Sequence, residues 1–347
     1  MKKVISAMLS LALVFSLAAC GNGNQTAAQS GSQGGDGSQQ SVEPVSLKMA
    51  VMVGAGTPGD LSAQYFCEEI EARSNGAITI DYYPGGSLGS NDEVTEQLLT
   101  GTCDIVWNTL DWYSKLQPDW NVLGLGFAVD SKEHLKAFMD SEKNLEIEEK
   151  LRTEQGIRIL THDGYAYPRV VVSTFPINTA DDLYGVNMRI PELPLYVKTW
   201  SAIGVNCTTL ASTDVYMGLK DGIVEAVEFP LGSIFGQSWY EVAPYITYTN
   251  HLYAPYVMSM NETSFQKLTP ELQELILECA AETAKKYEEL DTESVETNVQ
   301  KMVDAGAILN ETPDVDSFIA KLSDTAAECE AEGLWSEGLY EYIQSLR

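Results

Sequence analysis

The chain has 347 residues, of which 50 are acidic and 21 are basic, and its formal net charge is −29 at pH 7. This excess of negative charge argues against partners that are themselves anionic, namely nucleic acids and anionic lipid surfaces. It also repels anionic solutes at long range. A site for a carboxylate must therefore be a local cluster of buried or half-buried arginine side chains.

The first residues have the features of an export signal followed by a tether. A basic start precedes an apolar run that ends at Ala18 and is shorter than the roughly 20 apolar residues of a bilayer-spanning helix. We therefore expect residues 1–19 to be a signal peptide. The run closes in Leu-Ala-Ala-Cys, which resembles a bacterial lipobox and predicts a lipidated Cys20; the alternative is an ordinary signal peptide with an incidental cysteine. The remainder of residues 20–44 is mostly small and polar, which predicts a flexible linker.

The region after the linker is predicted to be an α/β protein with two lobes. Its length of about 300 residues exceeds what one hydrophobic core usually serves. Strands and helices are predicted to alternate, with strands at residues 45–53, 77–83 and 104–107 and helices at residues 61–73 and 91–100. This alternation is typical of βα units and a mostly parallel sheet, in which ligands bind at loops beyond the carboxyl ends of strands. The candidate loops are residues 54–59, 108–113 and 164–168.

A long periodic segment follows later in the chain. Thr269 and Pro270 form a helix-start signature. From Leu272 to Met302, apolar residues then recur mostly at steps of three or four positions. The pattern predicts one continuous helix of more than 30 residues, and two helices broken near residues 291–294 are the alternative.

Cysteines and short motifs give no support for a metal or a cofactor. Apart from Cys20, the chain has an odd number of cysteines with no CxxC spacing, so a zinc site is not expected and buried free thiols are. HExxH, P-loop and EF-hand motifs are absent from the sequence. Residues 85–89 do satisfy G-x-S-x-G, and His251 lies far enough downstream to serve a hydrolase, so a surface-tethered serine hydrolase is an alternative function.

Four short motifs lie close together in the middle of the chain. They are Met188-Arg189-Ile190-Pro191, the stretch from Val215 to Gly222, Glu228-Phe229-Pro230 and Thr249-Asn250-His251. In this order and at this spacing, the segment resembles the solute-binding proteins of TRAP transporters, the dicarboxylate-binding (DctP-like) family. The resemblance covers roughly residues 45–325 and is specific between residues 185 and 270.

The resemblance implies a periplasmic-binding-protein-like fold. Two α/β lobes would enclose a ligand cleft, with the long helix spanning both and hinge strands near Ala166 and Ala254. Lobe I is then expected to comprise residues 45–166 and 255–294, and lobe II residues 167–254 and 295–347.

The resemblance also implies a function without catalysis. The protein would be an extracytoplasmic receptor, monomeric and anchored by lipid to the outer face of the cell membrane or to the periplasmic side of a membrane. It would bind a small organic acid and deliver it to the membrane permease subunits of a TRAP transporter. A solute-binding lipoprotein of an ABC importer is the alternative, because a lipobox, a linker and a two-lobed fold are common to both classes.

Arginine is the side chain best suited to a carboxylate, because its planar guanidinium offers two parallel N–H donors. Arg189 lies at the end of a predicted strand, residues 185–190, and matches the ligand-binding arginine of the TRAP family. Arg169 matches a second arginine position that contacts the ligand in some members, although it could instead be an inter-strand partner.

Other positions bear on specificity through the resemblance. Phe229 and Glu192 stand where the family often has Asn, and Ser212 where it often has an aromatic residue. These departures favour a smaller or partly apolar acid over a polyhydroxylated one. Further candidates for the ligand pocket are Trp107, Asn108, Tyr165 and Trp239. Glu93 fits an acidic position common in the family and is expected to cap a helix or close the cleft.

Overall fold

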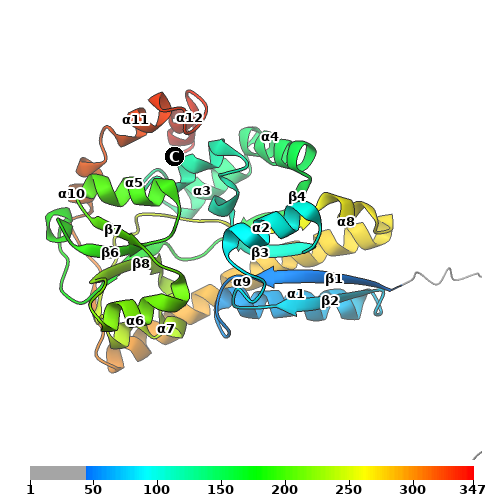
Figure 1. Cartoon of the computed structure of the whole chain (residues 1–347), viewed down its shortest axis with the longest axis horizontal. Coiled ribbons are helices and arrows are strands. Elements are labelled where there is room, and N and C mark those ends of the chain that lie inside the picture. Colours follow the sequence, from blue (N-terminus) through cyan, green and yellow to red (C-terminus); the bar gives the residue numbers. More distant parts are fainter. Residues whose placement is uncertain (1–43) are drawn as a thin grey trace, which may run out of the picture. The chain divides into compact units, whose positions relative to one another are not determined.

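The computed structural model describes residues 44–347 (Figure 1). The predicted signal peptide, the lipidation of Cys20 and all of the linker except Pro44 lie outside the described residues. Within residues 44–347, no helix is both long enough and apolar enough to cross a membrane.

The first sheet has five strands in the order β2-β1-β3-β10-β4. Their bounds are β1 Val45–Val51, β2 Ile78–Tyr83, β3 Ile105–Thr109, β4 Ile157–Gly164 and β10 Tyr256–Asn261. The associated helices are α1 Pro58–Arg73, α2 Asn91–Thr100, α3 Lys132–Met139, α4 Glu142–Lys150 and α8 Glu262–Gln266. The strands and helices predicted for the first half are confirmed, with ends that differ by no more than three residues. We call this sheet and its helices lobe I.

The second sheet has six strands in the order β11-β9-β5-β8-β6-β7. Their bounds are β5 Arg169–Ser173, β6 Asn187–Ile190, β7 Asn206–Thr209, β8 Ala226–Pro230, β9 Tyr245–Thr247 and β11 Ile308–Asn310. The associated helices are α5 Pro194–Ile203, α6 Val215–Lys220, α7 Ile234–Gln237 and α10 Val315–Lys321. We call this sheet and its helices lobe II.

Each sheet contains a single strand that runs against the others. In lobe I, β10 pairs antiparallel with both β3 and β4, and in lobe II, β5 pairs antiparallel with both β8 and β9. The remaining pairs are parallel, which confirms the prediction of mostly parallel sheets. Both exceptional strands are the first strand after the chain has passed from one lobe to the other.

The two passages between the lobes are short connectors. Residues 165–168 join β4 to β5, and residues 248–255 join β9 to β10, and neither segment is assigned to a strand. The sequence predicted hinge strands near Ala166 and Ala254. Ala166 lies in the first connector, two residues beyond the end of β4, and Ala254 lies in the second connector, two residues before the start of β10.

The helix α9, Pro270–Asp304, runs for 35 residues and confirms the prediction of one continuous helix. It begins at Thr269, whose side chain accepts a hydrogen bond from the Leu272 backbone N–H. Its first part packs on α1 and β4 of lobe I, and its later part packs on η6, Leu231–Ser233, and on α7 of lobe II. Helix α9 is thus a third connection between the lobes.

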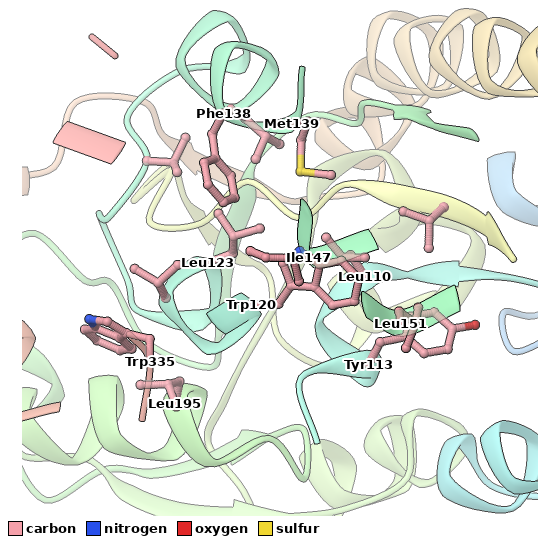
Figure 2. Packing of buried hydrophobic residues seen from close by; sticks show 14 of the residues in the cluster. Leu110, Tyr113, Trp120, Leu123, Phe138, Met139, Ile147, Leu151, Leu195 and Trp335 are labelled. Carbon is pink, nitrogen blue, oxygen red and sulfur yellow. The ribbon is translucent and has the colours of Figure 1, made fainter. Parts of the chain in front are cut away.

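The segment that follows α10 was predicted to belong to lobe II. Its helices are α11 Thr325–Ala331 and α12 Leu339–Gln344. Trp335 and Ile343 are buried in one cluster with Trp120 and Phe138 of lobe I, and Leu195 on α5 of lobe II belongs to the same cluster, so this segment packs on lobe I as well as on lobe II (Figure 2). His134 on α3 contacts the carbonyl oxygen of Ile343 at 2.7 Å, in agreement with the closeness of α3 and α12 in Figure 1. The apolar spacing of this segment predicts a buried face but cannot indicate which lobe covers it.

Candidate functional site

A cavity of about 510 Å³ lies between the two lobes. Its walls are the loops that follow β1, β2 and β3 in lobe I and those that follow β6, β7 and β8 in lobe II. Arg169 and Tyr256, the first residues of β5 and β10, complete the lining. Because β5 and β10 run against their neighbours, their starts lie at the same sheet edges as the carboxyl ends of the parallel strands. The topology therefore gathers side chains from both sheets around one cleft.

Arg169 is held by a buried carboxylate network. Its Nε and Nη2 both donate to the carboxylate of Glu228 on the neighbouring strand β8, the Nη2 bond being 2.8 Å long. His251 Nε2 lies 3.3 Å from the same carboxylate, and His251 Nδ1 lies 2.7 Å from the hydroxyl of Thr249. Burial alone would raise the pKa of Glu228, but the guanidinium of Arg169 outweighs it and lowers that pKa to about 2.

The same network explains two of the motifs found in the sequence. Burial lowers the pKa of His251, which favours a neutral ring. A neutral ring that donates from Nε2 to Glu228 accepts at Nδ1 from the Thr249 hydroxyl, so every polar group in the chain of contacts is satisfied. The Glu-Phe-Pro and Thr-Asn-His motifs therefore supply the counter-ion of Arg169 and the groups that orient it.

Arg189 is in a different situation. It lies on β6, is 5% exposed, and its Nε donates to the carbonyl oxygen of Leu210 at 2.9 Å. Its Nη groups have no hydrogen-bond partner among the described residues, and no carboxylate forms a salt bridge with it. Burial lowers the pKa of Arg189 to about 10, with Glu228 acting in the opposite direction and Arg169 in the same direction.

The contrast with the other arginines of residues 44–347 is complete. Each of the others forms a salt bridge with a carboxylate: Arg73, Arg152, Arg158, Arg169 and Arg347. A buried guanidinium without a counter-ion costs free energy, and an anion bound in the cleft would offset that cost.

A buried acid also borders the cleft. Asp111 accepts hydrogen bonds from the hydroxyls of Thr109 and Tyr196, the second at 2.5 Å. The Arg169 guanidinium lies over the ring of Tyr196, with its carbon 5.2 Å from the ring centroid, and over that of Phe229 at 5.4 Å. The cleft therefore combines one unpaired cation with paired charges and aromatic faces.

Residues 49–332 match the family model of the bacterial extracellular solute-binding proteins, family 7, which is the DctP family. The chain belongs to this family. The resemblance to TRAP solute-binding proteins predicted from the motifs is thereby confirmed, and neither the ABC importer class nor the hydrolase gains support. In residues 44–347, Ser87 of the G-x-S-x-G stretch has no histidine partner, while His251 is occupied by Glu228 and Thr249.

Solved structures and curated relatives that are similar to this chain support the same family. A TRAP periplasmic solute-binding protein of Chromohalobacter salexigens, solved with bound D-glucuronate, is 27% identical with a TM-score of 0.81, over 87% of this chain and 100% of that one. A TRAP protein of a Sulfitobacter species, solved with bound β-D-galacturonate, is 26% identical with a TM-score of 0.79, over 87% of this chain and 99% of that one. The C4-dicarboxylate-binding protein DctB of Bacillus subtilis is 24% identical over 243 residues, which are 70% of this chain and 69% of DctB. The two-lobed α/β fold predicted from the resemblance is confirmed.

The structure brings together most of the site residues that the DctP resemblance and the predicted loops indicated. Of the predicted site residues, those that line the cleft are Arg189, Arg169, Glu192, Ser212, Phe229 and Asn108. Of the three loops predicted to bear the ligand, residues 108–113 contribute directly, whereas residues 54–59 and 164–168 do not line this cavity. Asp111 belongs to the predicted loop 108–113 but was not singled out, and Tyr196 on α5 had no sequence signal at all.

The other predicted residues lie elsewhere. Trp107 is fully buried and donates to the hydroxyl of Ser62 at 3.0 Å. Trp239 is buried behind Phe229, with the two rings edge-to-face at 4.7 Å. Tyr165 lines a second cavity of about 330 Å³, beside the connectors. The ligand contacts predicted for these three side chains remain predictions, and their positions favour a supporting role.

Glu93 has the capping role that the sequence suggested. Its carboxylate accepts from the Ser90 backbone N–H at 2.7 Å, and the Ser90 hydroxyl accepts from the Glu93 N–H, which is a capping box at the start of α2. Glu93 thereby fixes the N-terminus of α2, where Ser90 and Asn91 line the cleft.

Proposed function

We propose that this protein is the receptor of a TRAP-type transporter, which binds a small organic acid in the cleft and delivers it to a membrane permease. The observation that carries the proposal is Arg189, the one arginine of residues 44–347 without a carboxylate partner, buried at a cleft between two lobes. The sugar acids bound in solved TRAP relatives have the carboxylate that such a guanidinium would receive.

The proposed binding mode assigns one task to each side chain. Arg189 offers its two Nη groups to the ligand carboxylate, while its Nε stays on the Leu210 carbonyl and holds the guanidinium plane. Arg169 presents its remaining Nη1 to the cleft with its orientation set by Glu228. Asn108, Ser212, Glu192 and Phe229 contact the rest of the ligand. The ring of Phe229 is braced by Trp239, and Trp107 braces Tyr256 at 5.2 Å in the same way.

Closure of the lobes would complete the site. The chain passes between the lobes through residues 165–168, residues 248–255 and α9, so these segments are the proposed hinge. In the proposed division, lobe I comprises residues 45–166 and 255–294 together with the segment that carries Trp335, and lobe II comprises residues 167–254 and the chain from residue 295 to α10. Excluding water from the closed cleft lowers the local dielectric and strengthens the ion pair at Arg189.

Location and partners complete the proposal. The protein acts outside the cytoplasm as a monomer and is anchored to the membrane by lipid on Cys20. Its closed form is the one that the permease subunits recognise. It catalyses no reaction and needs no cofactor, because a receptor only has to bind and release its ligand.

Calorimetric titration with a panel of organic acids tests the proposal. The chain from residue 20 onward is purified, freed of co-purified ligand and titrated with mono- and dicarboxylates, sugar acids and keto acids. One acid class should bind, and Arg189→Ala should weaken it at least about 100-fold, because a charge-assisted bidentate contact is lost. Arg73→Ala, which removes an arginine that pairs with Glu278 and Glu282 away from the cleft, is the matched control and should bind as the parent does.

Two results would contradict the proposal. Unaltered binding in Arg189→Ala would move the carboxylate site elsewhere, and a failure of every acid to bind to ligand-free protein would remove the carboxylate assignment altogether.

A further inference from the structure

The charges around the cleft bear on how many carboxylates its ligand carries. The reasoning rests on the proposed function, because it takes the cleft to be the ligand site. The charged side chains that line the cleft are Arg169, Arg189, Asp92, Asp111 and Glu192. The question is which of these charges already has a partner within the protein.

Arg169 has no charge to spare for a ligand. Two of its nitrogens bind the carboxylate of Glu228, and the carboxylate of Asp111 also acts on it, since both acids contribute to a raised Arg169 pKa. The guanidinium of Arg169 therefore already has its counter-ion within the protein. His251 adds no positive charge, because burial lowers its pKa.

The charges of the acidic side chains that line the cleft are less completely balanced by partners within the protein than those of its arginines. Asp92 is exposed and pairs with Lys115 at 2.6 Å, so these two charges cancel each other. Asp111 accepts hydrogen bonds from two neutral hydroxyls and forms no salt bridge with any cation of residues 44–347. Glu192 is exposed and forms neither a salt bridge nor a side-chain hydrogen bond with any described residue.

Arg189 is thus the single unpaired cation of the cleft. One ligand carboxylate satisfies it. A second carboxylate on the same ligand would meet no free cation and would face the carboxylates of Asp111 and Glu192 instead, while losing its own water. Hydroxyl groups have the opposite preference, since they donate hydrogen bonds that these carboxylates accept.

We infer that the ligand is a hydroxylated monocarboxylic acid, and that Glu192 is a specificity residue which disfavours acids with a second carboxylate. The sequence favoured a smaller or partly apolar acid over a polyhydroxylated one on the basis of residues 192, 212 and 229. The cleft makes up for the polar groups missing at those positions with the side chains of Ser90, Asn91 and Thr209, and with the acceptor oxygens of Asp111.

Matched pairs of acids test this inference by calorimetry at pH 7.5. Each monoacid is compared with the diacid in which its terminal CH₂OH or CH₃ group is replaced by a carboxylate. D-gluconate with D-glucarate and 3-hydroxybutanoate with malate are two such pairs within a panel of hydroxy, aldonic and uronic acids. The tightest ligand should be a monoacid, and its diacid should bind at least about 100-fold more weakly, because its second carboxylate has no counter-ion.

A charge reversal then tests the role of Glu192. Glu192→Lys places a cation at the cleft and should raise the affinity for the diacid relative to that for the monoacid at least about tenfold, because the diacid gains a counter-ion where the monoacid loses a hydrogen-bond acceptor. Glu337→Lys gives the same change in net charge at an exposed position outside the cleft, and it should leave the ratio of the two affinities unaltered. The ratio distinguishes a direct effect in the cleft from a change in the long-range field.

The outcomes separate the inference from the function on which it rests. A diacid that binds as tightly as its monoacid, with loss of both in Arg189→Ala, would overturn the inference and leave the receptor function standing. An unchanged ratio in Glu192→Lys would overturn the role of Glu192. Failure of every acid to bind would overturn the receptor function and the inference together.

Discussion

Replacing Asp291 by asparagine should stabilise the protein at neutral pH. Asp291 lies in α9 where the helix passes from lobe I to lobe II, and its side chain is buried. One carboxylate oxygen accepts from the backbone N–H of Tyr167 in the first connector at 2.7 Å, and the other has no partner. The unpartnered oxygen lies so close to Gly232 that a Cβ atom there would be 2.0 Å from it.

The magnitude follows from the ionisation of this carboxyl group. Burial raises the pKa of Asp291 from 3.8 to about 6, and the bond from Tyr167 only partly opposes it. The ionised form is disfavoured in the folded state, so the fold loses stability as pH rises from about 4 to about 6 and retains the whole penalty above that. At 1.36 kcal/mol per pKa unit, the penalty is ~3 kcal/mol.

Asparagine removes the charge and retains an oxygen for the Tyr167 N–H. Its NH₂ group then takes the place of the unpartnered oxygen and is itself buried without a hydrogen-bond partner, which costs about 1 kcal/mol. The net gain at pH 7.5 is therefore ~2 kcal/mol, and for a protein of this size it raises the Tm by roughly 3 °C. At pH 4.5 most of the penalty in the parent has gone, so the gain should vanish.

Urea denaturation and thermal unfolding at pH 7.5 and 4.5 measure both values. Glu296→Gln, which neutralises an exposed acid on the same helix, is the matched control and should change stability little at either pH. An Asp291→Asn protein that is less stable than the parent at pH 7.5, or a gain that is the same at both pH values, would refute the reasoning.

Three further changes test individual contacts by urea denaturation. Glu228→Gln should destabilise by about 3–5 kcal/mol, because Arg169 is left as a buried charge without its counter-ion; a loss below about 1 kcal/mol would contradict this account of the network. Gly232→Ala should destabilise by about 1–3 kcal/mol through its collision with Asp291, and much of that loss should disappear in an Asp291→Ala background, as a double-mutant cycle would report. Ser90→Ala removes a capping box and should destabilise by about 1 kcal/mol, with no loss indicating that the start of α2 is held by other contacts.

The features that the sequence predicted well are those set by neighbours along the chain. The strand and helix pattern of the first half and the continuity of α9 both follow from local periodicity, and between Glu271 and Asp304 neither Pro nor Gly interrupts that helix. Arg189 could be identified as the candidate ligand-binding arginine because several motifs lie close to it in the sequence.

The features that were missed depend on pairing between distant segments. The sequence indicated an inter-strand partner as an alternative role for Arg169 but did not identify Glu228 as that partner, because the pairing depends on the register of β5 against β8, which neither segment encodes alone. Tyr196 reaches Asp111 from a helix of the other lobe. The placement of Trp335 on lobe I similarly depends on a return of the chain that no local pattern specifies.

That return of the chain constrains the order in which the protein can fold. Trp335, Leu339 and Ile343 share a buried cluster with Trp120 and Phe138, which are roughly 200 positions earlier in the chain. A polypeptide that emerges from a membrane with its N-terminus first therefore exposes the apolar face around Trp120 until nearly the whole chain has been released. Lobe I therefore cannot complete its core as an early, independent unit. The protein is most exposed to aggregation, and most in need of a chaperone outside the membrane, between the release of Trp120 and the release of Trp335.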